Sequence, residues 1–475
     1  MDPGLKILTF ADNKACDTRT LKKEKMHPHD LMDRAVFRIF QQLQTMIPEK
    51  SNISILCGPG DNGADGLCLS SMLTARGYSI GTLIFLLGKK PSPALSFRMD
   101  LYAQQKDMNV QVVNSVDLFS LRENTWVIDA LFGTGLTRPL QNEWESLVNK
   151  INDSAYKIIS IDMPSGLLGE SCDENMPFIK SEKVLTIQSP KPALLYPENK
   201  IDFDVVDCGI STKMTNTNRL YLDSGSAISE QMKKLLPKRP RHSHKGTFGH
   251  TLLIGGNTGM HGAISMAAKA CYEAGSGLTS VLSPDSCITY LAAQPGIMHI
   301  PGLLDKSSLP KINAEKFSSV AIGPGLGKNL ATTDFLGDLL DMFQIPLILD
   351  ADALNILSEN TGMLARLPEN SLITPHPAEF KRLFGPTKNG RDKELLASEK
   401  SNELDIYILA KDTYSFLACP DGKIFYNGTG NSGLARGGSG DKLTGTIAGL
   451  FAQNQNMRDA ALAGMYFSGA GNVVI

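Results

Sequence analysis

Two long stretches of this chain alternate short runs of β-type residues with amphipathic helical runs. In the first stretch the β-type runs are Ile53–Cys57, Thr82–Leu87, Val110–Val113, Trp126–Leu131 and Lys157–Ile161. Apolar residues at a spacing of three or four predict a helix before them, with Leu31, Ala35, Val36, Ile39, Phe40 and Leu43 on one face. Because strands joined through helices run parallel, the pattern predicts a doubly wound α/β sheet with helices on both faces.

The second stretch begins near Leu222 and shows the same alternation. Its β-type runs are His250–Ile254, Leu278–Leu282, Ser319–Ile322, Pro346–Asp350, Leu372–Thr374 and Ile406–Leu409, followed by a hairpin of Ser415–Cys419 and Ile424–Tyr426. A chain of 475 residues is too long for one ordinary core. We therefore expect two α/β domains, residues 1–218 and 219–475, joined by a polar linker at Ser211–Asn218. The end of the chain, Gly471–Ile475, has no helix-ending signal, so a further C-terminal element is expected.

Composition excludes several classes of protein. A hydrophobic content of 42%, a charged content of 20% and a net charge of -2 are those of a globular chain without a general affinity for nucleic acid or membranes. We read the basic stretch Lys233–Lys245 as a solvated connection, since it has two prolines and no interleaved aromatic residues. The start of the chain has no signal-peptide pattern, and the eight scattered cysteines form no CxxC pair. These features predict a protein of the reducing cytoplasm.

A glycine-rich stretch, Asn427–Gly445, contains Gly-Gly-Ser-Gly-Asp at residues 437–441, where an apolar helical run begins. A glycine turn at a helix start directs several backbone N–H groups at one point, where the helix dipole favours an anion. A carboxylate there, Asp441, would repel the anion, so its presence suggests a base that takes a proton from a hydroxyl attacking phosphorus. The alternative is a merely flexible loop, which rarely ends in such a clear helix start.

A second glycine-rich turn, Cys57–Gly66, follows a strand in the first stretch. Gly58, Gly60 and Gly63 satisfy GxGxxG, a dinucleotide-binding pattern that is weak alone. A dehydrogenase also needs an acidic residue about 20 residues later, where this chain has Gly88-Lys89-Lys90. An ordinary NAD-dependent dehydrogenase is therefore disfavoured.

Two more strand ends in this half carry polar residues. Asp129 ends one strand before a glycine-rich turn, and Asp162 and Ser165 follow the next. Since ligands bind at the carboxyl ends of parallel strands, these loops should converge. Oxygen ligands from Asn62, Asp129 and Ser165 suit a hard cation such as K⁺, while Asp65 or Asp162 would contact a ribose or transfer a proton. The alternative is that each Asp only caps a turn.

The second half has a similar set of strand-end residues. Strands lead into Asn257–Ala263, into the turn Ile322-Gly-Pro-Gly-Leu-Gly327, and into Leu349–Asn355 and Thr374–Glu379. The last two segments supply Asp352, Asn355, His376 and Glu379. None of these turns is a Walker A loop, because GK[ST] is missing. A lone histidine is more often structural, but His376 lies between two prolines, and we expect it to face a ligand.

Taken together, these motifs resemble the fused NAD(P)H-hydrate repair enzymes. The loops of the first half resemble the epimerase domain over about residues 5–215, and the Gly-Gly-Ser-Gly-Asp stretch with the other turns of the second half resembles the ADP-dependent dehydratase domain over about 222–475. The resemblance implies a Rossmann-like doubly wound sheet followed by a ribokinase-like α/β domain. This chain departs from the family at Asp61 and Ala64, within the usual NNGGD loop, and at Asp412, where glycine usually follows the lysine.

The resemblance also assigns residues by position. Asp162 and Asp441 would be catalytic. Epimerase substrate contacts would come from Asp61, Asn62, Gly63, Ala64, Asp65, Gly133, Thr134, Gly135, Leu136, Thr137, Arg138, Pro139 and Asp162, with K⁺ at Asn62, Asp129 and Ser165. The dehydratase would hold its substrate with Ala263, Gly325, His376 and Asp441, and its nucleotide with Lys411, Asp412, Thr413, Tyr414, Ser415 and Gly440.

The implied activity is the repair of hydrated NADH and NADPH. The first domain would interconvert R and S hydrates, and the second would dehydrate the S form with ADP, accompanied by Mg²⁺, giving AMP and phosphate. Small molecules would be its only partners apart from further copies in a homo-oligomer. One alternative is a ribokinase-like small-molecule kinase with an N-terminal nucleotide-binding module. Another makes both halves non-catalytic ligand-binding domains, which an intact Asp441 with its glycines disfavours.

Overall fold

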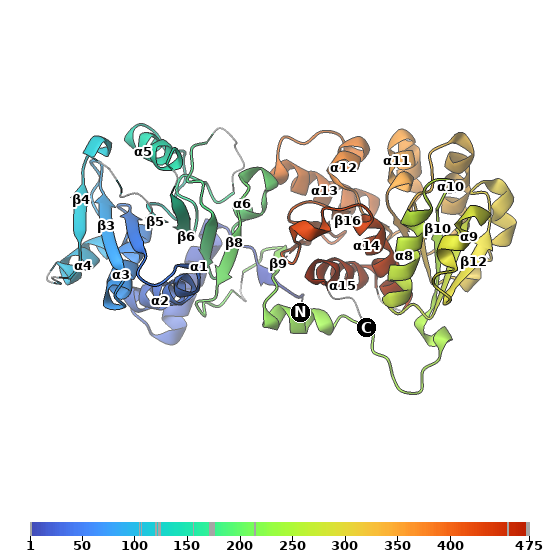
Figure 1. Ribbon diagram of the computed structural model, residues 1–475, viewed down its shortest axis with the longest axis horizontal. Coiled ribbons are helices and arrows are strands. Elements are labelled where there is room, and N and C mark those ends of the chain that lie inside the picture. The colour runs from blue at the N-terminus through green and yellow to red at the C-terminus, as the bar shows by residue number, and fades with distance from the viewer. Residues whose placement is uncertain are drawn as a thin grey trace. The chain divides into compact units, whose positions relative to one another are not determined.

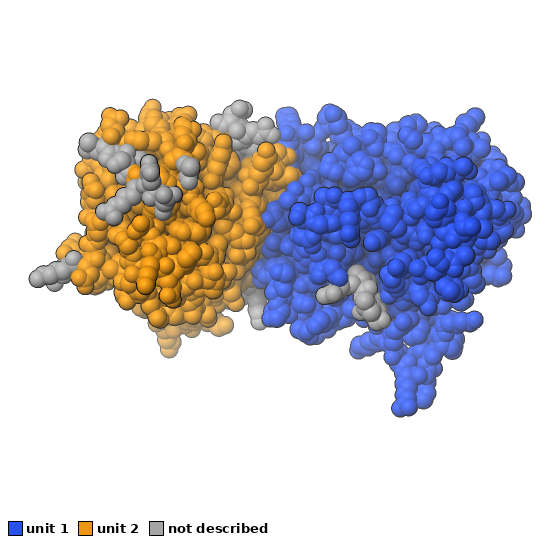
Figure 2. All heavy atoms as spheres, viewed as in Figure 1, with its two compact units in different colours: residues 1–5, 218–475 blue, residues 6–217 orange. Residues whose placement is uncertain are grey.

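The computed structural model describes residues 2–471 except 104, 106, 119–120, 122–124, 155, 171–175, 213–214 and 454–455. The chain forms two compact units, one of residues 6–217 and the other of residues 1–5 and 218–475 (Figure 2). Each unit has its own sheet, as the sequence predicts. Residues 213–214 of the expected linker and residues 472–475 lie outside the described residues. The expectation that no helix-ending signal is present near the end of the chain is wrong, because the last described helix, α15 (Met457–Ala470), ends at Gly471, a left-handed C-cap with a φ of +76°.

The first unit contains a seven-stranded sheet in the order β4-β3-β2-β5-β6-β7-β8. Every neighbouring pair in it is parallel, which confirms the predicted doubly wound sheet. The order reverses at β2, so the carboxyl ends of β2 and β5 flank the point where ligands usually bind. The strands are β2 (Asn52–Cys57), β3 (Ser79–Phe85), β4 (Val110–Val113), β5 (Trp126–Ala130), β6 (Lys157–Ile161), β7 (Lys183–Ile187) and β8 (Phe203–Val206).

Helices cover both faces of this sheet (Figure 1). One apolar cluster joins the sheet to α1, α2 and α3, and a second joins it to α5. Helix α2 begins with a capping box of His27 and Asp30, and its six predicted apolar positions are all buried. Helix α1, which begins with a capping box of Thr9 and Asp12, has no such regular apolar stripe and was missed. The helices are α1 (Phe10–Glu24), α2 (Pro28–Met46), α3 (Asp61–Ala75), α4 (Pro93–Tyr102), α5 (Glu143–Asn152) and α6 (Pro192–Leu195).

The second unit contains an eleven-stranded sheet in the order β1-β9-β18-β17-β16-β15-β14-β13-β10-β11-β12. The strands from β16 to β12 are parallel, and the predicted hairpin forms the antiparallel pair β17 and β18. The edge strand β12 was not predicted. The strands are β1 (Leu5–Lys6), β9 (Arg219–Leu222), β10 (His250–Ile254), β11 (Leu278–Ser283), β12 (Ile297–Pro301), β13 (Ser319–Ile322), β14 (Leu347–Leu349), β15 (Leu372–Ile373), β16 (Tyr407–Ala410), β17 (Phe416–Ala418) and β18 (Ile424–Asn427).

Two helices of this unit, α8 and α14, pack with their backbones unusually close. A β-carbon added at Gly445 would lie 1.9 Å from the carbonyl oxygen of Ala267, and one at Gly449 would lie 2.4 Å from that of Cys271. Glycine is therefore required on this face of α14. The helices are α7 (Ser226–Lys233), α8 (His261–Glu273), α9 (Ile288–Leu291), α10 (Leu330–Met342), α11 (Asp352–Glu359), α12 (Pro377–Phe384), α13 (Gly390–Leu404), α14 (Ser439–Phe451) and α15 (Met457–Ala470).

The first five residues belong to the second unit, although the sequence placed them in the first half. Strand β1 lies beside β9 in the eleven-stranded sheet, and Asp2 forms ion pairs with Lys423 at 3.3 Å and with Arg458 at 3.2 Å. Pairing over such a sequence separation leaves no local signal, which explains the difference.

Two features of composition have structural counterparts. The seven described cysteines are all free and buried, while Cys172 lies outside the described residues. Within the described part of the chain, no helix is both long and apolar enough to cross a membrane.

Candidate active sites

The three polar loops of the first unit meet at the carboxyl end of its sheet. A β-carbon added at Gly133, in the loop after β5, would lie 3.0 Å from Asp162 Oδ2 and 3.2 Å from Asn62 Oδ1. Asp162 follows β6, and Asn62 is in the first turn of α3. The predicted convergence of these loops is confirmed.

The glycines of the first loop allow this close approach. A β-carbon added at Gly58 would lie 1.8 Å from the carbonyl oxygen of Leu131, and one at Gly63 would lie 1.9 Å from that of Gly58. The side-chain nitrogen of Asn62 is buried and has no hydrogen-bond partner among the described residues. An unsatisfied buried donor is costly, so this atom is suited to a ligand oxygen.

Asp129 is the centre of a hydrogen-bond network at the end of β5. Its side chain is fully buried and accepts hydrogen bonds from the Ser165 hydroxyl at 2.5 Å, the Ser165 N–H at 2.8 Å, the Ser160 hydroxyl at 2.8 Å and the Leu131 N–H at 3.2 Å. Burial raises the pKa of Asp129 despite these bonds. Part of the structural alternative thus holds, because Asp129 orders the loops around it.

The same network contains oxygens that suit a hard cation. The Ser165 hydroxyl lies 2.5 Å from Asp129 Oδ1 and 3.1 Å from the carbonyl oxygen of Phe132. All three atoms are oxygens, and Asn62 Oδ1 belongs to the same loop cluster. The residues therefore fit the chemistry of K⁺, and K⁺ at Asn62, Asp129 and Ser165 stays a prediction.

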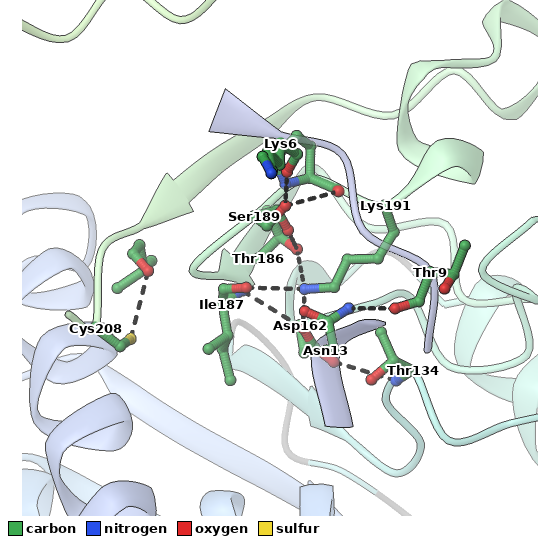
Figure 3. A network of polar contacts seen from close by, with 12 residues as sticks. Lys6, Thr9, Asn13, Thr134, Asp162, Thr186, Ile187, Ser189, Lys191 and Cys208 are labelled. Atoms are coloured by element: carbon green, nitrogen blue, oxygen red, sulfur yellow. Dashed lines mark hydrogen bonds and ion pairs between the residues drawn. The ribbon is translucent and has the colours of Figure 1, made fainter. Parts of the chain in front are cut away.

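Asp162 is held by a buried lysine that we did not identify from the sequence (Figure 3). Lys191 Nζ lies 2.5 Å from Asp162 Oδ1 and donates further to the Thr186 hydroxyl at 2.8 Å and the Ile187 carbonyl at 3.0 Å. The Thr134 N–H donates to Asp162 Oδ2 at 3.1 Å. Burial alone would raise the pKa of Asp162, but the charge and hydrogen bonds of Lys191 outweigh it and lower the pKa. Asp162 is therefore an oriented, ionised carboxylate.

Two further carboxyl groups near Asp162 have the opposite tendency. Burial, followed by the negative charge of Asp162, raises the pKa of Asp65 well above its usual range. The same two causes raise the pKa of Asp17, on α1, to about 6. The unit thus brings together an ionised Asp162 and an acid-like Asp65, as proton transfer requires, whereas Asp17 with a pKa of about 6 is mostly ionised at neutral pH. Asp17 has no sequence motif around it and was missed.

The remaining predicted substrate contacts of this unit differ in exposure. Ala64 is fully buried, and Leu136, whose N–H donates to the Gly133 carbonyl at 3.3 Å, is partly exposed. The exposed residues are Asp61, Gly135, Thr137, Arg138 and Pro139. Their contacts with a substrate stay predictions.

The predicted site residues of the second unit also lie at the carboxyl end of its parallel strands. Gly325 follows β13, and Ala263 is in the first turn of α8. A β-carbon added at Gly325 would lie 2.7 Å from the Met260 carbonyl and 3.5 Å from the β-carbon of Ala263. Since Gly325 also has a φ of +61°, glycine is favoured there on two grounds, and the two predicted residues are adjacent.

Asp441 lies in the first turn of α14. The helix is preceded by Gly438, whose φ of +87° favours glycine and where a β-carbon would displace the end of the Met266 side chain. The N–H groups of Gly440 and Asp441 have no acceptor among the described residues, as expected of an anion cradle. Burial and then the negative charge of Asp350 raise the pKa of Asp441 to about 6, although Lys411 lowers it. A base with that pKa is matched to neutral pH.

Beneath this turn lies a charged pair, of which the sequence suggested only one member. Lys411 Nζ donates to Asp350 Oδ1 at 2.8 Å, and the Thr444 hydroxyl donates to Asp350 Oδ2 at 2.7 Å. A β-carbon added at Gly440 would lie 3.4 Å from Lys411 Nζ and 3.7 Å from Asp350 Oδ2. Lys411 and Gly440, both predicted to bind the nucleotide, are therefore neighbours.

His376 has a clear structural role. It is the N-cap of α12, and its Nδ1 accepts hydrogen bonds from the N–H groups of Ala378 at 3.1 Å and Glu379 at 3.3 Å. Its Nε2 lies 3.3 Å from Glu379 Oε1. Burial and nearby positive charges, of which Lys411 is the strongest, lower the pKa of His376. The side chain is 47% exposed, so a contact with substrate stays a prediction.

The segment 411–415 is ordered by Asp412, the residue at which this chain departs from the family it resembles. Asp412 Oδ2 pairs with Lys393 Nζ at 2.8 Å, and its Oδ1 accepts the Thr413 N–H at 2.8 Å. The Ser415 hydroxyl bonds to both the N–H and the carbonyl of Asp412, at 3.2 and 3.1 Å. Lys393 is largely buried and comes from α13. The carboxylate that Asp412 introduces is therefore paired and hydrogen-bonded within the fold.

Comparisons with known families agree with this arrangement of two sites. Residues 28–193 match the family described as YjeF-related protein N-terminus, and residues 251–473 match that described as NAD(P)H-hydrate dehydratase. A crystal structure of the ADP/ATP-dependent NAD(P)H-hydrate dehydratase from Bacillus subtilis, co-crystallised with ATP and Mg²⁺, is 31% identical and covers 51% of this chain and 86% of its own, with a TM-score of 0.46.

Relatives that span both halves are also found. A bifunctional NAD(P)H-hydrate repair enzyme from Moorella thermoacetica is 33% identical over 98% of this chain and 91% of its own length. One from Escherichia coli is 32% identical over 93% of this chain and 84% of its own length. The resemblance drawn from the motifs is confirmed, and the chain belongs to the family of bifunctional NAD(P)H-hydrate repair enzymes.

Proposed function

We propose that this chain repairs hydrated NADH and NADPH. The unit of residues 6–217 interconverts the R and S hydrates, and the other unit dehydrates the S hydrate with ADP. The observation that carries the proposal is Asp441, a carboxylate in the first turn of α14 beside Lys411 and beside N–H groups that have no acceptor in the part of the chain that the structure describes, with its pKa raised to about 6. Membership of the family supports the assignment of two activities to two units.

The mechanism of the dehydration is determined by the group that has to leave the ring. Water is a poor leaving group, so the ring hydroxyl is first phosphorylated. Asp441 takes the proton of this hydroxyl while the hydroxyl oxygen attacks the terminal phosphorus of ADP, and AMP departs. Loss of phosphate, with a proton from the ring, then restores the double bond. The N–H groups of Gly440 and Asp441, with Lys411, stabilise the transferring phosphoryl group. Mg²⁺ enters with the nucleotide, whose phosphates supply oxygen ligands, and we assign it no protein ligands.

The epimerisation needs one group that accepts a proton and another group that donates one. Asp162, kept ionised by Lys191, is the base in this proposal, and Asp65 is the group that retains or returns a proton. K⁺ at Asn62, Asp129 and Ser165 would neutralise negative charge at the loop cluster. Replacing K⁺ by choline in the assay should slow epimerisation and leave dehydration of the S hydrate unchanged.

The test of the proposed function is incubation of hydrated NADH with ADP and Mg²⁺. We expect the absorbance of reduced nicotinamide to return and AMP to form. If a phosphorylated dinucleotide accumulated instead, the kinase alternative would hold. We also expect NADPH hydrate to be repaired, further copies of the chain to be its only protein partner, and neither nucleic acid nor membrane to bind.

A further inference from the structure

Asp350 lies at the carboxyl end of β14, directly beneath the first turn of α14. Its side chain is almost fully buried, and both its N–H and its carbonyl group are in close contact with the end of β13 and the residue that follows it. The N–H of Asp350 donates to the Ile322 carbonyl at 3.1 Å, and a β-carbon added at Gly323 would lie 1.8 Å from the Asp350 carbonyl. The carboxylate is therefore held in one place.

Both oxygens of this carboxylate are engaged. Oδ1 accepts from Lys411 and Oδ2 from Thr444, at 2.8 and 2.7 Å. The backbone of Lys411 is fixed as well, because its N–H donates to the Pro375 carbonyl at 2.9 Å. Burial disfavours the charge on Asp350, but Lys411 and Thr444 outweigh it and lower its pKa. Asp350 is thus an ionised group at neutral pH.

The pair of Asp350 and Lys411 faces the point where phosphate is expected. The pair lies next to Gly440, whose N–H belongs to the cradle. A β-carbon added at Gly440 would be in van der Waals contact with the pair, at 3.4 Å from Lys411 Nζ and 3.7 Å from Asp350 Oδ2. Glycine at this position lets a ligand phosphate come close to the ammonium group.

The same pair acts on Asp441 with opposite signs. Three charged groups influence its carboxyl: Asp350, which follows β14, Asp352 at the start of α11, and Lys411, which follows β16. The first two favour the protonated form, and Lys411 favours the ionised form. Asp352 is itself held, since its Oδ2 accepts the Gly327 N–H at 2.9 Å.

We infer that Asp350 is a positioning residue of the dehydratase site, which holds Lys411 against the first turn of α14 and sets the proton affinity of Asp441. Asp350 accepts a hydrogen bond from Lys411 and adds a negative charge beside it. As a result, Lys411 does not form an ion pair with Asp441, and it does not lower the proton affinity of Asp441 so far that this residue would be too weak a base. This inference rests on the proposed function, since it concerns the base and the phosphate site of that reaction.

The test uses two variants with opposite expected effects. In Asp350→Asn the negative charge is lost and Lys411 is freed, so the acid limb of the pH profile of kcat/KM should move from about pH 6 to lower pH by roughly one unit. The KM for ADP should rise at least several-fold, because Lys411 is no longer held. In Lys411→Met the same limb should move to higher pH.

A control separates this role from a merely structural one. Thr444→Val removes one hydrogen bond from Asp350 but keeps both charges, so its acid limb should stay within a few tenths of a unit of the wild type. If the wild type is active and the acid limb of Asp350→Asn is unchanged, the inference is overturned. If Asp350→Asn does not fold, Lys411→Gln, which keeps a hydrogen-bond donor for the buried Asp350 but removes the positive charge, decides in its place: an acid limb that does not move to higher pH would overturn the inference.

Failure of the proposed function can be distinguished from failure of this inference. If wild-type enzyme restored no reduced nicotinamide from the hydrate with ADP, the function itself would be wrong. ADP binding, measured by calorimetry on the wild type and both variants, then still reports on Lys411. Weaker ADP binding in Asp350→Asn supports the positioning role, and equal binding in all three proteins contradicts it.

Discussion

Replacing Asp441 with Asn tests the phosphoryl-transfer mechanism at its base. The substitution keeps the size of the side chain and leaves the N–H groups of α14 in place, but the amide cannot accept a proton at neutral pH. In the wild type a carboxyl group with a pKa of about 6 is roughly 90% ionised at pH 7. A positioned general base contributes about 10²–10⁴-fold in rate, which corresponds to about 2.7–5.4 kcal/mol in the barrier.

We therefore expect Asp441→Asn to slow dehydration of the S hydrate by about 10²–10⁴-fold. The wild-type rate should fall about tenfold per pH unit below pH 6, since protonation removes the base, while the residual rate of the variant should be flat there. The affinity for ADP should change little, because the N–H groups of Gly440 and Asp441 and the Lys411 ammonium hold the phosphates.

The assay follows the absorbance of reduced nicotinamide with purified S hydrate and ADP between pH 5 and 8. Epimerisation of the R hydrate by the same variant protein serves as an internal control, since Asp441 lies in the other unit. A dehydration rate within a few-fold of the wild type would remove Asp441 from the chemistry, and with it the mechanism.

Three further predictions concern the rest of the chain. Lys191→Met leaves the buried Asp162 without its cation, so it should destabilise the first unit by about 3–5 kcal/mol and abolish epimerisation while dehydration continues; thermal unfolding and both assays check this, and an unchanged melting temperature would refute it. Gly438→Ala forces a side chain into a positive φ and against Met266, at about 1–3 kcal/mol, whereas the matched control Gly437→Ala meets no atom within 4 Å and should be nearly neutral in urea unfolding. A fragment of residues 219–475 should dehydrate the S hydrate and leave the R hydrate behind; equal consumption of both would contradict the division of labour.

Much of the architecture follows from local patterns. The apolar spacing of α2 and the strand–helix order predict the sheets, because burial of one face per element leaves a periodic signal. Asn62, Asp129 and Ser165 could be placed together because parallel strands end at one edge of a sheet. Local signals were absent for α1, whose apolar positions are few, and for the edge strand β12, which is only partly buried.

The pairings that determine charge could not be predicted. Lys191 and Asp162 are 29 residues apart, and Lys411 and Asp350 are 61 residues apart. Their contacts depend on how the strands are ordered in the sheet, which the spacing of residues does not encode. The raised pKa of Asp441 follows from such contacts, so the motif identifies the base but not its proton affinity.

The central claim is that two units of one chain complete a single repair. Its most direct test supplies an equal mixture of R and S hydrated NADH with excess ADP and Mg²⁺, and measures reduced nicotinamide, AMP and phosphate together. We predict full recovery of both epimers as NADH, with AMP and phosphate formed in equal amounts to it. Recovery that stopped when the S hydrate was exhausted, or a phosphorylated dinucleotide that persisted, would contradict the claim.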